Sequence, residues 1–186
     1  MKASIGGKRA RPRPKHPTVD VLTQEEAQVV LQEVLAACPA LSPDVEKIAE
    51  NVMAKVAFNE VAANLSTALQ ELDMDDTDAG SHAWGYLEPS EAACKLVSRT
   101  VEPYLADLKR RLKLRHETEA MEVCKGIVLG LYRAEQADGE LLEYATDCPS
   151  ELAGEAVDIW RRRNRRRKFP PDFVEKFTPE WTWLLR

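Results

Sequence analysis

The chain has 186 residues, of which 44% are hydrophobic and 31% are charged, and this composition predicts one globular domain with a sizeable core. No run of about 18 uncharged apolar residues occurs, so we expect no membrane span. The basic N-terminal section is not followed by the apolar segment of a secretory signal, and we therefore expect a cytoplasmic protein.

The formal net charge of −5 is unevenly distributed along the chain. Residues 1–17 carry six Lys or Arg and no acidic residue, and residues 161–168 carry seven basic residues. The section 18–160 holds 28 acidic and 11 basic residues, a formal charge of −17. We expect an acidic body with a basic extension at each end.

Apolar residues recur every three or four positions through this body, which is the pattern of amphipathic helices. A first helix is predicted after Thr23, which forms a candidate capping box with Glu26. A second helix opens at Ser42, a cap residue followed by a first-turn proline. A third begins at about Asn59 and ends where the loop after Leu72 starts.

Prolines mark the next two predicted helix starts, at Pro89 and Pro103, because proline fits the first turn of a helix but not its interior. The segment 117–134 is apolar on nearly all sides and should lie at the centre of the fold. Within it, Gly126 and Gly130 would let another helix approach closely.

A short helix around 141–145 and a last one after Cys148 complete the predicted body. Similar openings at 89–97 and 149–157 suggest a helical-hairpin repeat of about 60 residues, although shared helix-start residues explain most of the similarity. The predicted fold class is all-α, with about seven or eight helices in stacked antiparallel hairpins. The predicted organisation is a basic disordered tail at 1–20, a helical domain at 21–160, and a basic run with an aromatic strap at 161–186.

The four cysteines contain no CxxC pair, and the three histidines do not complete a ligand-spaced set with them, so no zinc site is predicted. We expect free, mostly buried thiols in a reducing compartment. No cofactor is predicted.

The loop LDMDDTDAGSHAWGYLEP, residues 72–89, is the candidate binding site. Its candidate residues are Asp73, Asp75, Asp76, Asp78, His82, Trp84 and Tyr86. A calcium loop starting at Asp73 fails, because position 6 lacks the required glycine and position 12 lacks the bidentate glutamate. A looser cation site and a catalytic site with His82 as general base stay open beside the simpler alternative of solvated carboxylates and aromatic anchors.

The run WRRRNRRRKF, residues 160–169, has the highest density of charge in the chain. The basic patch consists of Arg161, Arg162, Arg163, Arg165, Arg166, Arg167 and Lys168. It could bind nucleic-acid phosphates, with Trp160 and Phe169 as stacking surfaces. We favour an intramolecular role at a helix C-terminus or against the acidic body, because that body repels a nucleic-acid backbone.

The final segment PPDFVEKFTPEWTWLLR, residues 170–186, has few helix signals but four aromatic residues, including the candidate docking residues Trp181 and Trp183. Exposed aromatic side chains at a terminus are usually covered. This segment is expected either to pack on its own body as a strap or to dock in a groove on another subunit or partner.

The segments GYLEPSEAA, CKGIVLGLY and DCPSELAGEAV together resemble a group of bacterial proteins of unknown function. More loosely, the arrangement is similar to helical regions that accompany SWIM zinc-finger proteins. The resemblance covers about residues 20–160 and implies a repeat-like helical module without established chemistry. The SWIM cysteine and histidine ligands are absent here, so the resemblance implies no metal site.

These observations predict a non-enzymatic protein-interaction or scaffold module, because packed helical hairpins offer grooves and the chain has docking tails. The expected partner is an unidentified protein or a second copy of the chain. The second hypothesis is a nucleic-acid-associated accessory protein that uses the arginine run. The third is a metal-dependent hydrolase centred on residues 73–86.

Overall fold

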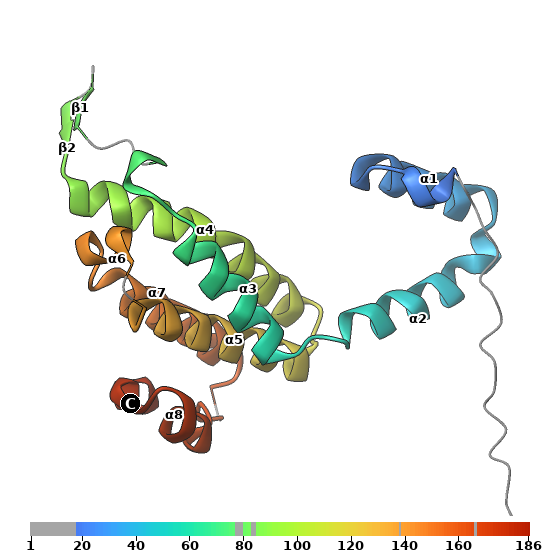
Figure 1. The fold of residues 1–186 in the computed structure, drawn as a ribbon. Helices are drawn as coiled ribbons and strands as arrows, with labels where there is room; N and C mark the ends of the chain where they lie inside the picture. Colours follow the sequence, from blue (N-terminus) through green and yellow to red (C-terminus); the bar gives the residue numbers. More distant parts are fainter. Residues whose placement is uncertain (1–17, 77–79, 83–84, 138, 166) are drawn as a thin grey trace, which may run out of the picture. The chain divides into compact units, whose positions relative to one another are not determined.

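The computed structural model describes residues 18–186 except 77–79, 83–84, 138 and 166 (Figure 1). Helices packed against one another dominate it, which confirms the predicted all-α class. The chain divides into two compact units, Met1–Asn51 and Val52–Arg186. No described residue of the first two helices is buried, whereas the C-terminal segment packs within the larger unit. Residues 1–17 of the predicted basic tail lie outside the described residues, and the predicted division at residues 20 and 160 stays a prediction.

The first unit contains α1 (Gln24–Ala37) and most of α2 (Ser42–Met53), with the 3-10 turns η1 (Val19–Val21) before α1 and η2 (Pro39–Leu41) between the two helices. The predicted capping box starts α1. The hydroxyl of Thr23 accepts from the Glu26 N–H at 3.3 Å, and the Glu26 carboxylate accepts from the Thr23 N–H at 2.9 Å. No residue described in α1 or α2 is buried.

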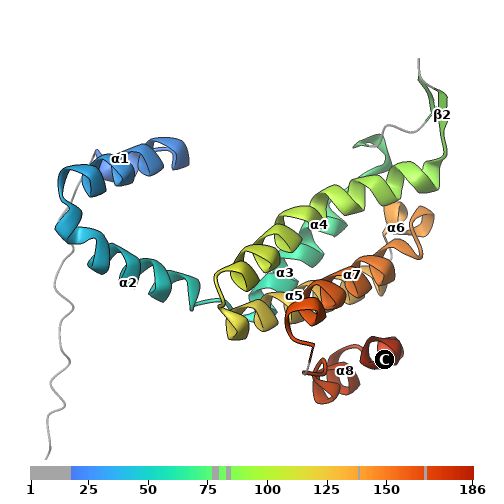
Figure 2. The same cartoon turned by 180° about the vertical axis from the view of Figure 1, so that it is seen from behind.

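The second unit is a helical bundle with α5 (Glu117–Glu135) at its centre. Helix α5 packs against α3 (Phe58–Gln70), α4 (Pro89–Lys113) and α7 (Cys148–Arg163), as Figures 1 and 2 show. The short helix α6 (Glu140–Tyr144) precedes α7. The largest fully buried side chains of these helices include Leu65, Leu69, Val97, Leu105, Leu108, Ile127, Leu131 and Trp160. The segment predicted to be central is therefore central.

Helix α3 packs tightly against α5, and the two glycines of α5 lie at their contact. A Cβ atom on Gly126 would lie 2.5 Å from the Val61 Cβ, and one on Gly130 would lie 3.0 Å from the Leu65 Cβ. Only glycine fits at the first of these positions without movement of the helices. The predicted close approach is confirmed.

Pro103 lies inside α4, and the predicted helix start at this position is wrong. The neighbouring residues Val101 and Leu105 are 0% and 1% exposed, on the same buried face as Leu108. Burial of this continuous face keeps α4 in one piece, although proline cannot donate the helical hydrogen bond at its own position.

The loop between α3 and α4 is partly regular. A 3-10 turn, η3 (Met74–Asp76), precedes strands β1 (Gly80–His82) and β2 (Gly85–Leu87). The strands pair antiparallel, with Ser81 opposite Tyr86. The sequence pattern did not predict this short pair.

The aromatic C-terminal segment packs on its own bundle, which is one of the two predicted alternatives. It forms α8 (Pro171–Phe177) and the 3-10 segment η4 (Pro179–Leu185). The rings of Phe173 and Phe177 contact Phe58 of α3 edge-on, with centroids 5.6 and 5.5 Å apart. These contacts explain a helix that local propensity did not indicate.

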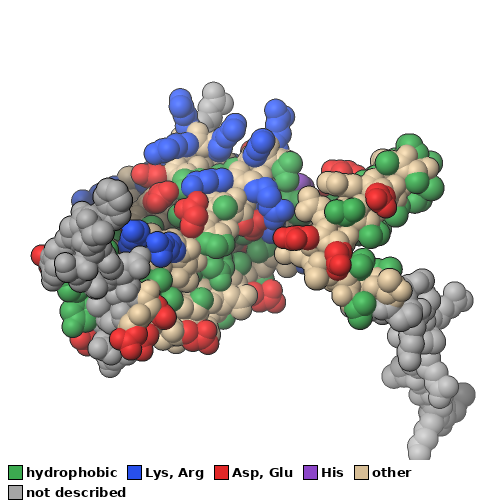
Figure 3. Space-filling model, turned by 90° about the horizontal axis from the view of Figure 1, so that it is seen from above, with side chains coloured by type: hydrophobic (Ala, Val, Ile, Leu, Met, Phe, Trp, Pro, Cys, Tyr) green, Lys and Arg blue, Asp and Glu red, His purple; other side chains and the backbone are tan. Residues whose placement is uncertain are grey.

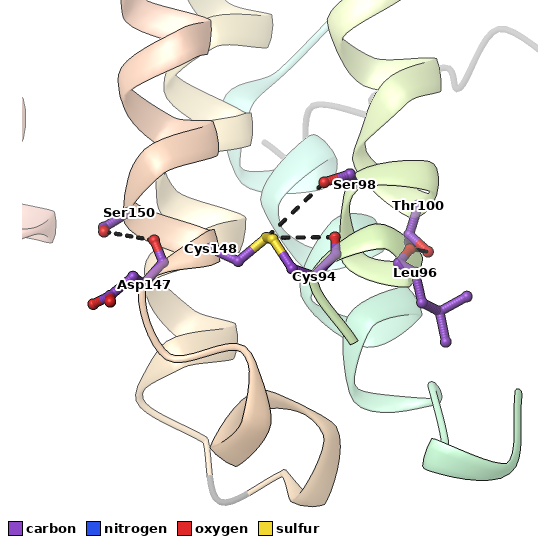
Figure 4. Close-up of a disulfide and its surroundings, with 7 residues drawn as sticks. All are labelled: Cys94, Leu96, Ser98, Thr100, Asp147, Cys148 and Ser150. Atoms are coloured by element: carbon purple, nitrogen blue, oxygen red, sulfur yellow. Dashed lines mark hydrogen bonds between the residues drawn. A yellow bond between two sulfur atoms is a disulfide. The ribbon is translucent and has the colours of Figure 1, made fainter. Parts of the chain in front are cut away.

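A disulfide joins Cys94 of α4 to Cys148 of α7, with their Cα atoms 5.7 Å apart (Figure 4). The expectation of four free thiols is therefore wrong for this pair, whereas Cys38 and Cys124 are free. The two bonded residues are 54 positions apart, and no local spacing marks them as partners. The cysteines thus no longer support a reducing compartment, and the cytoplasmic location stays a prediction.

Candidate functional site

The carboxylates at the start of the acidic loop bond to the loop's own backbone. The Asp75 N–H donates to the Asp73 carboxylate at 3.1 Å, and the Asp73 N–H donates to the Asp76 carboxylate at 3.4 Å. Both bonds stabilise the turn at η3 rather than gathering the side chains around a common point.

The other candidates of this loop contribute no described side chain. Asp78 and Trp84 lie outside the described residues, and only the backbone of His82 and Tyr86 is described, in β1 and β2. Among the residues that the structure describes, no group of three or more His, Cys, Asp or Glu could hold a metal ion. The cation site and the hydrolase site stay predictions.

Two members of the basic run bind groups of the same chain. The guanidinium of Arg161 donates to the Leu184 carbonyl and lies 3.9 Å from the Asp158 carboxylate. Arg167 forms a 3.1 Å ion pair with Glu117, the first residue of α5. The predicted intramolecular role therefore holds for these two arginines.

Four further members of the run are exposed: Arg162, Arg163, Arg165 and Lys168. Within the described part of the chain none of them has an ion-pair partner. The seventh member, Arg166, lies outside the described residues. The acidic body thus leaves more than half of the described run available to an external anion.

The two aromatic residues that flank the run do not offer stacking surfaces. Trp160 and Phe169 are 1% and 0% exposed, and their rings pack edge-on with centroids 6.2 Å apart. That prediction is wrong, because an amphipathic α7 and the segment after it bury these rings in the core.

The candidate docking aromatics differ in exposure. Trp181 is 4% exposed and packs edge-on against Tyr132 of α5, with centroids 5.2 Å apart, so it is engaged within the chain. Trp183 is 37% exposed and lies beside Gly154 of α7. Docking of a partner at Trp183 stays a prediction.

Buried Arg111 pairs with partly exposed Asp107 and binds the last residue of α2, and sequence reasoning missed this contact. Arg111 is 8% exposed, and its guanidinium donates to the Asp107 carboxylate and to the Met53 carbonyl, each at 2.7 Å. Burial raises the pKa of Asp107, but hydrogen bonds from Arg111 and Arg110 outweigh it and hold that pKa below its usual value. The i,i+4 spacing of the pair was visible in the sequence, whereas its burial was not.

A hollow of about 320 Å³ lies between the end of α5 and the start of α7. Its lining includes Glu135 and Glu143. Burial, with Glu180 and Asp147 nearby, raises the pKa of Glu135. Its polar lining among the described residues consists of Glu135, Glu143 and Thr146, without Cys, His, Lys or Arg.

The apolar faces of the first unit are exposed. On α1, Val30, Leu31 and Val34 are 40%, 45% and 40% exposed, and Ile48 of α2 is 61% exposed. Helical periodicity places these α1 side chains on one stripe. Nothing described within this unit covers that stripe.

Comparison with known proteins gives no match to a family model, a curated protein or a solved structure. The resemblance to bacterial helical proteins and to SWIM-associated regions therefore stays a prediction. Of the helices described, none is both long enough and apolar enough to cross a membrane.

Proposed function

We propose that the protein is a non-enzymatic protein-interaction module and that α1 and α2 form its contact surface. One observation supports this proposal: the apolar stripes of two amphipathic helices are solvent-exposed within their own unit. Such a stripe normally lies against a core, and when it does not it marks an interaction site.

The energetics favour a partner for these helices. Helices α1 and α2 have 14 and 12 residues, lengths at which an isolated helix is only marginally stable in water. Burial of each large apolar side chain contributes roughly 1.5–3 kcal/mol. A partner that covers Val30, Leu31 and Val34 would therefore supply the packing that the unit itself lacks.

The charge of this unit indicates what kind of partner fits. Residues 18–51 contain seven acidic residues and a single lysine, Lys47. A second copy of the same surface would bring like charges together, whereas a groove with an apolar floor and a Lys- or Arg-rich rim would attract it. We therefore expect a different protein that takes an amphipathic helix into such a groove.

The test uses substitutions of one kind on two faces of α1. Val30→Gln with Val34→Gln places polar side chains on the apolar stripe, whereas Val29→Gln makes the same change about 100–140° away around the helix. Glutamine has at least the helix propensity of valine, so neither change weakens the helix itself. A photo-cross-linking residue at position 31 or 29 of the full chain identifies what lies against each face in host extract.

We expect one protein to be cross-linked from position 31 and not from position 29. Its recovery should fall in the Val30→Gln, Val34→Gln variant and persist in Val29→Gln. Equal recovery with all variants would contradict the proposal. Cross-links only between copies of the chain would replace the expected partner with self-association.

A further inference from the structure

Two basic helix ends lie towards the same end of the bundle. Helices α4 and α7 both run towards the end at which α5 begins, as Figures 1 and 2 show. The last turn of α4 carries Arg110, Arg111 and Lys113, and the last turn of α7 carries residues 161–163, all arginines. The ion pair from Arg167 to the first residue of α5 ties the run to this end. Figure 3 shows Lys and Arg side chains gathered on one side of the bundle.

The contacts at this end separate anchored from available cations. Arg161 and Arg167 are used within the chain, as are Arg110 and Arg111, which both pair with Asp107. The exposed residues Arg162, Arg163, Arg165, Lys168, Lys113 and Arg115 have no ion-pair partner among the described residues. Cations in the last turn of a helix interact favourably with the helix dipole. The arginines beyond Asn164 lie after the end of α7, so the dipole does not account for them.

The available arginines line two open hollows that share a wall. One hollow, of about 430 Å³, is lined by Asp158, Arg161, Arg162 and Arg165. The other, of about 370 Å³, is lined by Glu117, Arg162, Arg163, Asn164, Arg165 and Arg167. Arg162 and Arg165 belong to both hollows, so a ligand that spans the two would meet this pair at its middle.

The lining chemistry selects an anion of repeated phosphate groups. The two hollows together present five arginines and two carboxylates, and those carboxylates are within 4 Å of Arg161 and Arg167. Guanidinium groups bind phosphate oxygens through paired, charge-assisted hydrogen bonds. None of the described residues that line the two hollows is apolar, whereas a membrane-binding surface inserts apolar side chains beside its basic ones.

We propose that this end of the bundle binds the phosphodiester backbone of a nucleic acid, with Arg162, Arg163 and Arg165 as its principal contacts. The contacts go to phosphates, so the binding has little sequence preference. The acidic body limits the contact to a few phosphates and makes the affinity modest and strongly salt-dependent. The inference is independent of a partner at α1 and α2.

The experiment measures the anisotropy of a labelled single strand and a labelled duplex with the full chain between 50 and 200 mM salt. Three phosphate contacts predict a slope of log K against log salt of about −2.7 for the duplex and about −2.1 for the single strand. The duplex affinity should then fall about 40-fold across that range. The triple variant Arg162→Gln, Arg163→Gln, Arg165→Gln should lose this binding and this slope.

A charge-matched control replaces three basic residues that do not line the hollows: Lys95→Gln, Arg133→Gln and Lys176→Gln. These side chains are exposed, and the change in net charge is the same. The control should retain the affinity and slope of the wild type within about twofold. Equal losses in the two triple variants would overturn the proposal, because only overall charge would then matter.

Three further variants keep the result decisive if the triple glutamine variant unfolds. Single changes Arg162→Gln and Arg165→Gln should each reduce the duplex slope by about 0.9. Triple replacement by lysine keeps the charge and should keep the slope, while the affinity falls because lysine cannot form the paired bonds. Absence of nucleic-acid binding by the wild type would overturn the proposal. So would retention on phosphatidylserine vesicles that nucleic acid does not compete away.

Discussion

Replacement of Gly126 by alanine tests the close contact between α3 and α5. The added Cβ would lie 2.5 Å from the Val61 Cβ, 2.6 Å from its Cγ1 and 3.0 Å from the Phe58 carbonyl oxygen. Ordinary contacts between carbon atoms are about 3.5–4.0 Å. The Val61 Cβ and the carbonyl are fixed by the backbone of α3, so relief requires the two helices to separate by roughly 1 Å.

The net cost follows from two opposing effects. Overpacking at a site that cannot rotate away costs up to about 3 kcal/mol. The change from glycine to alanine inside a helix returns about 1 kcal/mol. We therefore expect Gly126→Ala to lower the free energy of unfolding by about 2 kcal/mol. With a urea dependence of about 2 kcal/mol per molar, the unfolding midpoint should fall by about 1 M.

Gly154→Ala is the matched control in α7. The nearest atoms to its added Cβ are ring carbons of Trp183 at 3.3 and 3.5 Å, and this partly exposed ring can move. The higher helix propensity of alanine should then outweigh the steric cost, and the urea midpoint should stay the same or rise. Unfolding of Gly126→Ala at the wild-type urea concentration, or an equal loss of stability in Gly154→Ala, would contradict a steric clash at this contact.

Three other predictions concern the stability of the bundle. Reduction of the disulfide between Cys94 and Cys148 should cost about 4 kcal/mol, from the loop entropy of a 54-residue separation; an unchanged melting temperature with dithiothreitol would contradict this. Asp107→Asn removes an acidic partner from buried Arg111 and should cost about 2 kcal/mol at pH 7. Because the pKa of Asp107 is lower in the folded than in the unfolded chain, its carboxylate stabilises the fold above the unfolded pKa, and this stabilisation is lost as pH falls through the folded pKa. The difference in urea midpoint between wild type and variant should therefore shrink below about pH 4. Thr178 is fully buried and its hydroxyl has no hydrogen-bond partner in the described part of the chain, so Thr178→Val should raise the free energy of unfolding by about 1 kcal/mol, and a lower urea midpoint would contradict this account.

Local features of the sequence predicted much of the bundle. The capping box at Thr23 and Glu26 involves residues three apart, and the structure confirms it. Gly126 and Gly130 predicted a close helix contact because their spacing puts both on one face, and α3 lies there. Both predictions follow from the spacing of nearby residues, and the second also assumes that another helix packs against the glycine face.

The features that the sequence did not predict depend on tertiary contacts. Pro103 is tolerated within α4 because the apolar face on both sides of it is buried, and the rule against interior proline describes an isolated helix. Cys94 and Cys148 become neighbours only through the packing of α4 on α7. The charge of the arginine run was evident in the sequence, but the division into anchored Arg161 and exposed Arg162 depends on Asp158 and the C-terminal segment.

The contact between Phe58 and Phe173 joins the first helix of the bundle to a residue synthesised 115 positions later. During translation, α3 therefore leaves the ribosome long before the rings that cover it exist. Contacts of such separation form slowly, because a long loop must close before the contact is gained. A nascent chain halted after α7 would present an uncovered aromatic edge, which makes this stage a point at which a chaperone could act.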